Sequence, residues 1–111
     1  HQHKVKVVDY VKKNIGIESA NSEIQHIGAY EYAPGGWISD HIHSNAEQWY
    51  YILEGDAIMK VGNEEEISSK GTLVFVPRNT VHSYKVIGDK PLKILNVATF
   101  FPGIESVTTI I

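Results

Sequence analysis

Residues 35–55 of the chain read GGWISDHIHSNAEQWYYILEG. Side chains two residues apart on a β-strand point to the same face of the sheet, so His41 and His43 are predicted to project together from one wall. Two imidazoles in that position can bind a single metal ion. The short loop after His43 leads into a second apolar and aromatic run that ends at Gly55. The segment therefore predicts two successive strands, with His41 and His43 as candidate ligands of a metal ion.

The rest of the chain continues the same period-two pattern in short β-branched and aromatic runs, which Gly, Pro, Asn and Asp residues separate. These runs predict strands at residues 5–10, 23–32, 37–43, 48–53, 57–61, 65–68, 73–76, 82–86 and 92–100. Residues 10–15 also fit one short helical turn. Many short strands with frequent turns indicate an all-β fold, either a sandwich or a single small antiparallel β-barrel. A closed barrel would leave no strand edge exposed.

The composition indicates a single folded domain over residues 1–111. With 42% apolar and 21% charged residues, the chain of 111 residues is an ordinary globular sequence. A net charge of -3, without a cluster of Lys and Arg, argues against nucleic acid and membrane surfaces as partners. No stretch approaches the roughly 18 apolar residues of a membrane helix, and no signal peptide is evident. We expect a cytoplasmic protein and interpret His1 to His3 as the remnant of an expression tag.

The chain has no cysteine, so a metal site requires imidazole, carboxylate or amide ligands. A single histidine on a strand is more often a structural or surface residue than a ligand, and His26 is interpreted in that way. The metal prediction therefore depends on the wider pattern around His41 and His43.

Two segments resemble the two motifs of the cupin superfamily. The first motif runs Gly, five residues, His-x-His, three or four residues, Glu, six residues, Gly, and residues 35–55 are similar to it except at the Glu. The second runs Gly, five residues, Pro-x-Gly, two residues, His, three residues, Asn, and it resembles residues 71–86, which begin GTLVFVPRNTVH. Asn79 stands at the inner Gly and Val86 at the final Asn. The resemblance covers residues 23–100 and implies a small jelly-roll barrel.

The metal ligands that the resemblance implies are His41, His43, Gln48 and His82. Counting back from Gly55 selects Gln48 at the position of the family's Glu. Counting forward from His43 also permits Glu47, although strand alternation would turn Glu47 onto the face of Trp49. A set of three imidazoles and one amide is neutral, so a divalent ion would keep its full charge and act as a strong Lewis acid. The set admits Zn, Ni, Fe, Mn, Co or Cu and does not select one of them.

Aromatic residues flank the predicted ligands on the same strands. By strand parity Trp37 and Tyr50 are candidate substrate-binding residues, with filling of the barrel core as the alternative reading. Glu47 and Tyr84 are the candidate proton-transfer groups.

Trp49 and Tyr51 are predicted to lie on the opposite, outer face of the barrel. Large exposed aromatic surface usually marks an interface. Small cupins are commonly homodimers, as the resemblance implies, and we expect this face to be buried against a second copy.

Two functions follow from the resemblance. The first is a metal-dependent enzyme that polarises a chelated, oxygen-rich small molecule, such as a sugar acid, a keto-enol or a polyketide-like compound. Its reaction class would be isomerase, lyase or cyclase, or dioxygenase. The ligand pattern is similar to that of the pectin-degradation cupins that open unsaturated uronate rings, but residues 94–102 lack the charges those enzymes carry there. The second is a non-catalytic barrel that binds or senses a small molecule, because few acid or base groups can be placed nearby.

Overall fold

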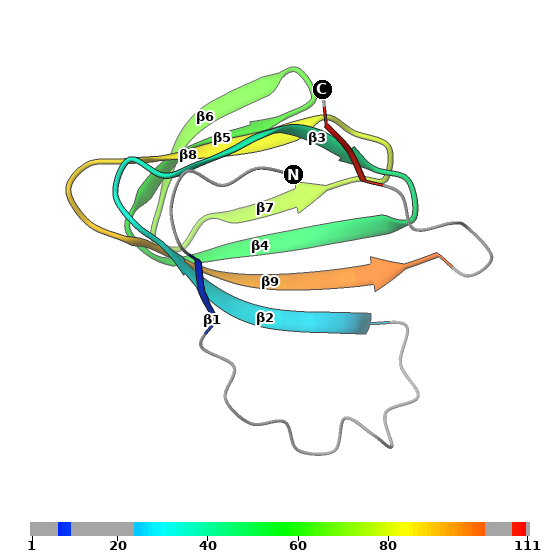
Figure 1. Ribbon diagram of the computed structural model, residues 1–111, viewed down its shortest axis with the longest axis horizontal. Helices are drawn as coiled ribbons and strands as arrows, with labels where there is room; N and C mark the ends of the chain where they lie inside the picture. Colours follow the sequence, from blue (N-terminus) through cyan, green and yellow to red (C-terminus); the bar gives the residue numbers. More distant parts are fainter. Residues whose placement is uncertain (1–6, 10–23, 102–107, 111) are drawn as a thin grey trace, which may run out of the picture.

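The computed structural model describes residues 7–9, 24–101 and 108–110 of the chain. Two five-stranded antiparallel sheets face each other in two layers (Figure 1). The strand orders are β1-β2-β9-β4-β7 and β10-β3-β8-β5-β6. The strands are β1 (Val7–Asp9), β2 (Ile24–Tyr32), β3 (Trp37–His43), β4 (Ala46–Glu54), β5 (Asp56–Val61), β6 (Glu64–Ser69), β7 (Leu73–Val76), β8 (His82–Ile87), β9 (Leu92–Phe100) and β10 (Thr108–Ile110).

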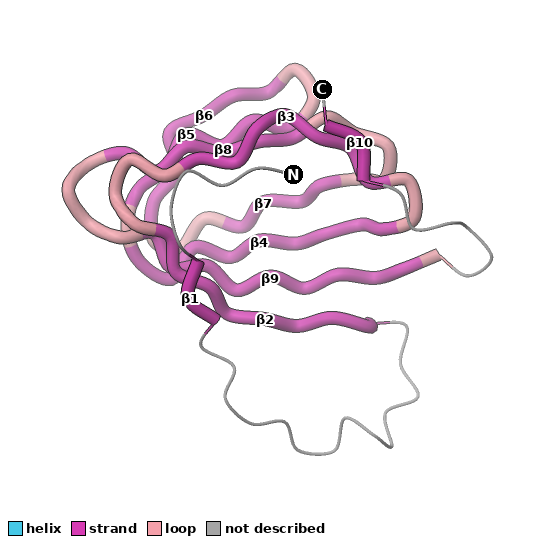
Figure 2. Tube along the Cα trace, in the orientation of Figure 1, coloured by secondary structure: helices cyan, strands magenta, loops and turns pink. Residues whose placement is uncertain are grey.

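Tight turns connect strands that face each other across the two layers. The β2–β3 and β8–β9 turns lie together at one end of the molecule, at the left of Figure 2. The β4–β5 connection is Gly55 at φ 85°, a left-handed conformation that favours glycine. A Cβ at Gly55 would also collide with the backbone oxygen of Pro91, in the β8–β9 turn. We call this end of the space between the sheets, where the β2–β3, β4–β5 and β8–β9 turns lie, the closed end.

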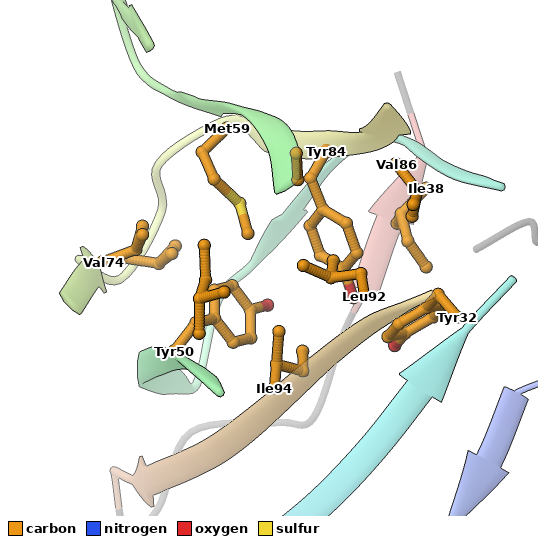
Figure 3. Close-up of a cluster of buried hydrophobic side chains, with 12 residues drawn as sticks. Tyr32, Ile38, Tyr50, Met59, Val74, Tyr84, Val86, Leu92 and Ile94 are labelled. Atoms are coloured by element: carbon orange, nitrogen blue, oxygen red, sulfur yellow. The ribbon is translucent and has the colours of Figure 1, made fainter. Parts of the chain in front are cut away.

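Alternate side chains of each strand point into the space between the sheets, as period-two sequences require. Figure 3 shows this core, in which tyrosine rings lie among aliphatic side chains. Tyr84 packs edge-on against Tyr32, with ring centroids 5.3 Å apart, and against Tyr50 at 5.8 Å. The buried cluster contains Tyr32, Ile38, Tyr50, Ile52, Ala57, Met59, Val74, Val76, Tyr84, Val86, Leu92 and Ile94.

The observed strands confirm the predicted all-β jelly-roll fold, with boundaries that differ by at most a few residues. One strand, β10, was not predicted, and it pairs with β3 beside the two histidines. The barrel is not closed by hydrogen bonds, because no ladder joins the two sheets among the described strands. The predicted helical turn at 10–15, the tag residues His1 to His3, and residues 5, 6 and 10 of the first predicted strand lie outside the described residues. Within the described ranges, the structure contains no helix that is long and apolar enough to cross a membrane.

Candidate metal centre

Three histidines meet at the end of the space between the sheets that lies away from the closed end. His41 and His43 come from β3, and His82 begins β8, where its Cα is the ladder partner of His41. Their candidate ligand atoms all lie within 4.8 Å of one another. His41 and His82 are each only 1% exposed. The structure thus gathers three of the four predicted ligands in one group.

Backbone carbonyls hold two of these imidazoles in a metal-binding orientation. Nδ1 of His41 donates to the carbonyl oxygen of Ser39 at 2.8 Å, and Nδ1 of His82 donates to that of Thr80 at 2.9 Å. A carbonyl oxygen only accepts, so the proton of each neutral ring is on Nδ1 and the lone pair is on Nε2. Nε2 of His82 is buried and has no hydrogen-bond partner in the protein. A buried nitrogen of this kind fits a metal ion, which would supply the missing partner.

Burial disfavours the charged form of His43 and His82. Desolvation, together with the neighbouring imidazoles, lowers the pKa of His43 from 6.5 to about 4 and that of His82 to about 4 as well. For His82, the hydrogen bond to the Thr80 carbonyl opposes part of that shift. Metal ions bind the neutral form of imidazole, so these rings are ready to act as ligands at neutral pH.

Gln48 lies on the inner face of β4, in line with buried Tyr50. Its Oε1 accepts a hydrogen bond of 2.9 Å from the Tyr50 hydroxyl. Gln48 therefore projects into the same space as the three histidines, from the facing sheet, and its amide is fixed by a neighbour. Its part as the fourth ligand stays a prediction.

Glu47 lies on the opposite face of β4, with Trp49, which is 42% exposed, and Tyr51, which is 41% exposed. Strand alternation places it there, because Gln48 and Tyr50 point inward. Among the described acidic and histidine side chains, Glu47 is not part of the group around His82. The structure therefore gives no support to Glu47 as a ligand or as a proton-transfer group.

Trp37 does not point into the space between the sheets, contrary to the prediction from strand parity. The β3–β8 ladder shifts register between Ile38 and His41, so that both of these residues point inward although they are three positions apart. Such an irregularity reverses the faces on either side of it. Trp37 lies instead on the outer face, above an open hollow that Lys60 and Lys85 also line.

Tyr50 and Tyr84 point inward as predicted, and both are buried. Desolvation raises the pKa of each phenol above its ordinary value of 10.0, and nearby Tyr32 adds to the shift. Both stay protonated at neutral pH and serve as hydrogen-bond donors rather than bases. Tyr84 is thus unsuited to accept a proton from a substrate.

His26 was interpreted as a structural or surface residue, and its exposed ring, with Nε2 2.8 Å from the Tyr30 hydroxyl, agrees with that reading. One inner-face group escaped the sequence analysis. Asn96 lies on the inner face of β9, where its Oδ1 is buried without a hydrogen-bond partner. Asn96 is a polar residue at an inward-pointing position of an otherwise apolar strand, and this pattern could have identified it.

The fold and the histidine cluster together define a jelly-roll domain with a candidate metal centre, and comparison with known families agrees. Residues 28–98 match the model of the Cupin domain family. The chain therefore belongs to the cupin family.

Several curated proteins are similar over part of their length. An uncharacterized protein of Methanocaldococcus jannaschii is 44% identical over 50% of this chain and 44% of its own length. The tetracenomycin polyketide synthase protein TcmJ of Streptomyces glaucescens is 28% identical over 62% of this chain and 46% of its own. Quercetin 2,3-dioxygenase of Bacillus subtilis is 36% identical over 60% of this chain and 20% of its own. The chain thus spans less than half the length of these relatives.

Among solved structures, a predicted oxalate decarboxylase of Thermotoga maritima superposes with a TM-score of 0.76. It is 20% identical, and the match covers 89% of this chain and 84% of that one. At this identity the likeness supports the fold alone.

Proposed function

We propose that this chain holds one divalent metal ion on His41, His43, Gln48 and His82 and acts on a small oxygen-rich molecule bound to that ion. The observation that carries the proposal is the buried Nε2 of His82, which has no protein partner and belongs to a group of three converging imidazoles. Leaving such a nitrogen unpaired costs stability, and a metal ion would remove that cost. The metal would supply Lewis-acid polarisation of oxygen atoms at its open positions.

The residues around the centre favour a substrate that chelates through oxygen. All four proposed ligands are neutral, so an enolate, carboxylate or similar oxygen anion would balance the charge of the ion. Tyr50 and Tyr84, kept protonated by burial, offer neutral phenols from the two facing sheets. The names of two relatives, a polyketide synthase protein and a quercetin dioxygenase, support aromatic or polyketide-like keto-enols as the substrate class. A cyclase, isomerase or dioxygenase reaction fits this class.

A second candidate function is a binding or sensing domain without catalysis. It is favoured by the position of Glu47 on the outer face of β4 and by the raised pKa of Tyr84, which keeps that phenol from acting as a base. The two functions share the metal centre and the chelated ligand. They differ in turnover alone.

The test of the shared step is a titration of the Co2+-loaded protein with allomaltol, a bidentate hydroxypyranone chelator. We expect the visible absorption of Co2+ to change and to saturate at a single chelator per metal. An unchanged spectrum would mean that the bound metal has no open positions for a chelating oxygen ligand.

We further propose that the chain forms a homodimer through the outer face of the β2-β9-β4-β7 part of its sheet. Apolar side chains cross this face in two ladder rows, and several of them are exposed. One row is Ile27, Val97, Trp49 and Phe75, and the other is Ala29, Leu95, Tyr51 and Leu73. A self-complementary apolar face of this kind suits a two-fold interface. Size-exclusion with light scattering tests it, and a monomer at micromolar concentration would contradict it.

A further inference from the structure

A set of polar groups lies on the inner face of β2 and β9, apart from the metal ligands. In the ladder, the Cα atoms of His26 and Gln48 are both partners of Ala98. His26 and Gln48 are therefore in one row across the sheet, with the small side chain of Ala98 between them. The next row contains Gly28, Asn96 and Tyr50.

This wall faces the three histidines. β2 and β9 lie in one sheet, and β3 and β8, which carry the histidines, lie in the other (Figure 1). The turns at the closed end join β2 to β3 and β8 to β9, so these strands run opposite each other. His26 and His43 are both at the ends of their strands that lie away from the β2–β3 turn. Groups on the two walls can thus contact the two ends of one ligand.

The Tyr30 side chain lies along β2 over Gly28, in a position that only a glycine at residue 28 permits. A Cβ on Gly28 would lie 2.5 Å from the Tyr30 hydroxyl oxygen, so any other residue would displace the ring. In this position the hydroxyl lies above Gly28 and 2.8 Å from Nε2 of His26. The two rings stack at an interplanar angle of 16°. Gly28 therefore places a tyrosine hydroxyl in the row of Asn96.

Asn96 supplies an unused acceptor in that row. Its Oδ1 is withdrawn from solvent and has no hydrogen-bond partner in the protein. A buried amide oxygen without a donor destabilises a fold, so an asparagine at this position needs a reason other than packing. The Asn96 oxygen can accept a hydrogen bond, and a ligand hydroxyl group could donate it.

We propose that Asn96, together with the Tyr30–His26 pair, forms a second subsite that binds a hydroxyl group of the ligand whose chelating oxygens lie at the metal. This inference rests on the proposed function and narrows the ligand to molecules with a chelating oxygen pair at one end and a hydroxyl at the other. Asn96 Oδ1 accepts a hydrogen bond from the ligand hydroxyl, and the Tyr30 hydroxyl, oriented by His26, contacts the oxygen of that ligand hydroxyl.

The experiment compares pairs of chelators that differ by one hydroxyl. Kojic acid carries a hydroxymethyl group where allomaltol carries a methyl group, and catechols with the same two substituents place the hydroxyl at a different distance. Dissociation constants are measured on the Co2+-loaded protein. We expect the hydroxylated member of at least one pair to bind about 3- to 10-fold more tightly, the usual effect of one hydrogen bond. In Asn96→Leu this preference should disappear while allomaltol binds as before.

Two further variants and a control make the result specific. Gly28→Ala, which displaces the Tyr30 ring, should reduce the preference without loss of metal. Asn63→Leu, at an exposed asparagine in the β5–β6 turn, should retain it. If Asn96→Leu fails to fold, Tyr30→Phe removes a single hydroxyl and tests the same subsite.

The outcomes separate this inference from the proposed function. The subsite is contradicted if both members of both pairs bind equally, or if the preference for the hydroxylated member remains in Asn96→Leu or Tyr30→Phe. Neither result contradicts the metal centre. Failure of every chelator to bind the metal-loaded protein overturns the proposed function, and the subsite with it.

Discussion

At both ends of the space between the sheets some side chains are withdrawn from water, but the two ends differ in chemistry. At the closed end, Leu92 is 0% exposed and Ile94 is 1% exposed, and their neighbours are apolar. At the other end His41 and His82 are each 1% exposed, and Nε2 of His82 has no partner. One end stabilises the fold by burying apolar surface, whereas the other buries polar groups at a cost to stability. This contrast indicates that the closed end serves the fold and the histidine end serves a ligand.

The largest effect should follow from a cavity at the closed end. Ile94→Ala removes buried methyl and methylene groups and should reduce the free energy of unfolding by about 2 to 5 kcal/mol. Urea denaturation of the metal-free protein measures the loss. Ile67→Ala is the control, because Ile67 is 75% exposed and should change stability by about 0.5 kcal/mol or less. Similar losses of stability for the two variants would show that burial at the closed end does not stabilise the fold.

Acid should destabilise the metal-free protein through the histidine end. The folded pKa values of His43 and His82 are about 4, below the ordinary 6.5, so the unfolded chain binds more protons. Stability from these neutral rings is fully present above pH 6.5 and is lost as pH falls toward 4. At about 1.4 kcal/mol per pKa unit, the shift corresponds to at most roughly 3 kcal/mol for buried His82 and to less for His43, which is only partly buried.

Urea denaturation at a series of pH values measures this dependence. The control is the variant with both His43→Phe and His82→Phe, in which the loss between pH 6.5 and 4 should shrink. If both proteins lose stability in parallel, the histidines do not cause the acid sensitivity.

The effect of the fourth ligand should be smaller. Gln48→Ala should weaken metal binding by about 10- to 100-fold, as seen for supporting groups at metal sites. Gln48→Glu should retain or tighten binding, because a carboxylate adds Coulomb attraction to a neutral ligand set. Competition with a chelator of known affinity measures these changes. Glu47→Ala is the matched control on the outer face of β4, and metal loss in this variant but not in Gln48→Ala would reverse the assignment.

Strand alternation could be predicted from the sequence, and it correctly placed Gln48 and Tyr50 inward. It failed at Trp37, because the register shift between Ile38 and His41 reverses the faces and has no signature in the local residues. His41 and His82 are far apart in sequence, so no local pattern predicts that they meet. The family resemblance was the basis for that prediction.

The arrangement of the polar groups on the inner face of β2 and β9 could not be predicted from the sequence. His26 and Asn96 come into adjacent rows only through the pairing of β2 with β9, which are separated by most of the chain. Long-range register of this kind depends on how whole strands pair, and no local pattern reports it. An isolated histidine such as His26 was therefore interpreted as structural.

The most direct test of the metal centre is elemental analysis of His82→Ala beside the wild type. Both proteins are equilibrated with the same divalent metal ion and freed of excess metal by gel filtration. We expect the wild type to retain a single ion per chain and His82→Ala to lose most of it, because one of three imidazole ligands is gone. His26→Ala, which removes a histidine outside the cluster, should retain the ion. Full metal content in His82→Ala would contradict the account.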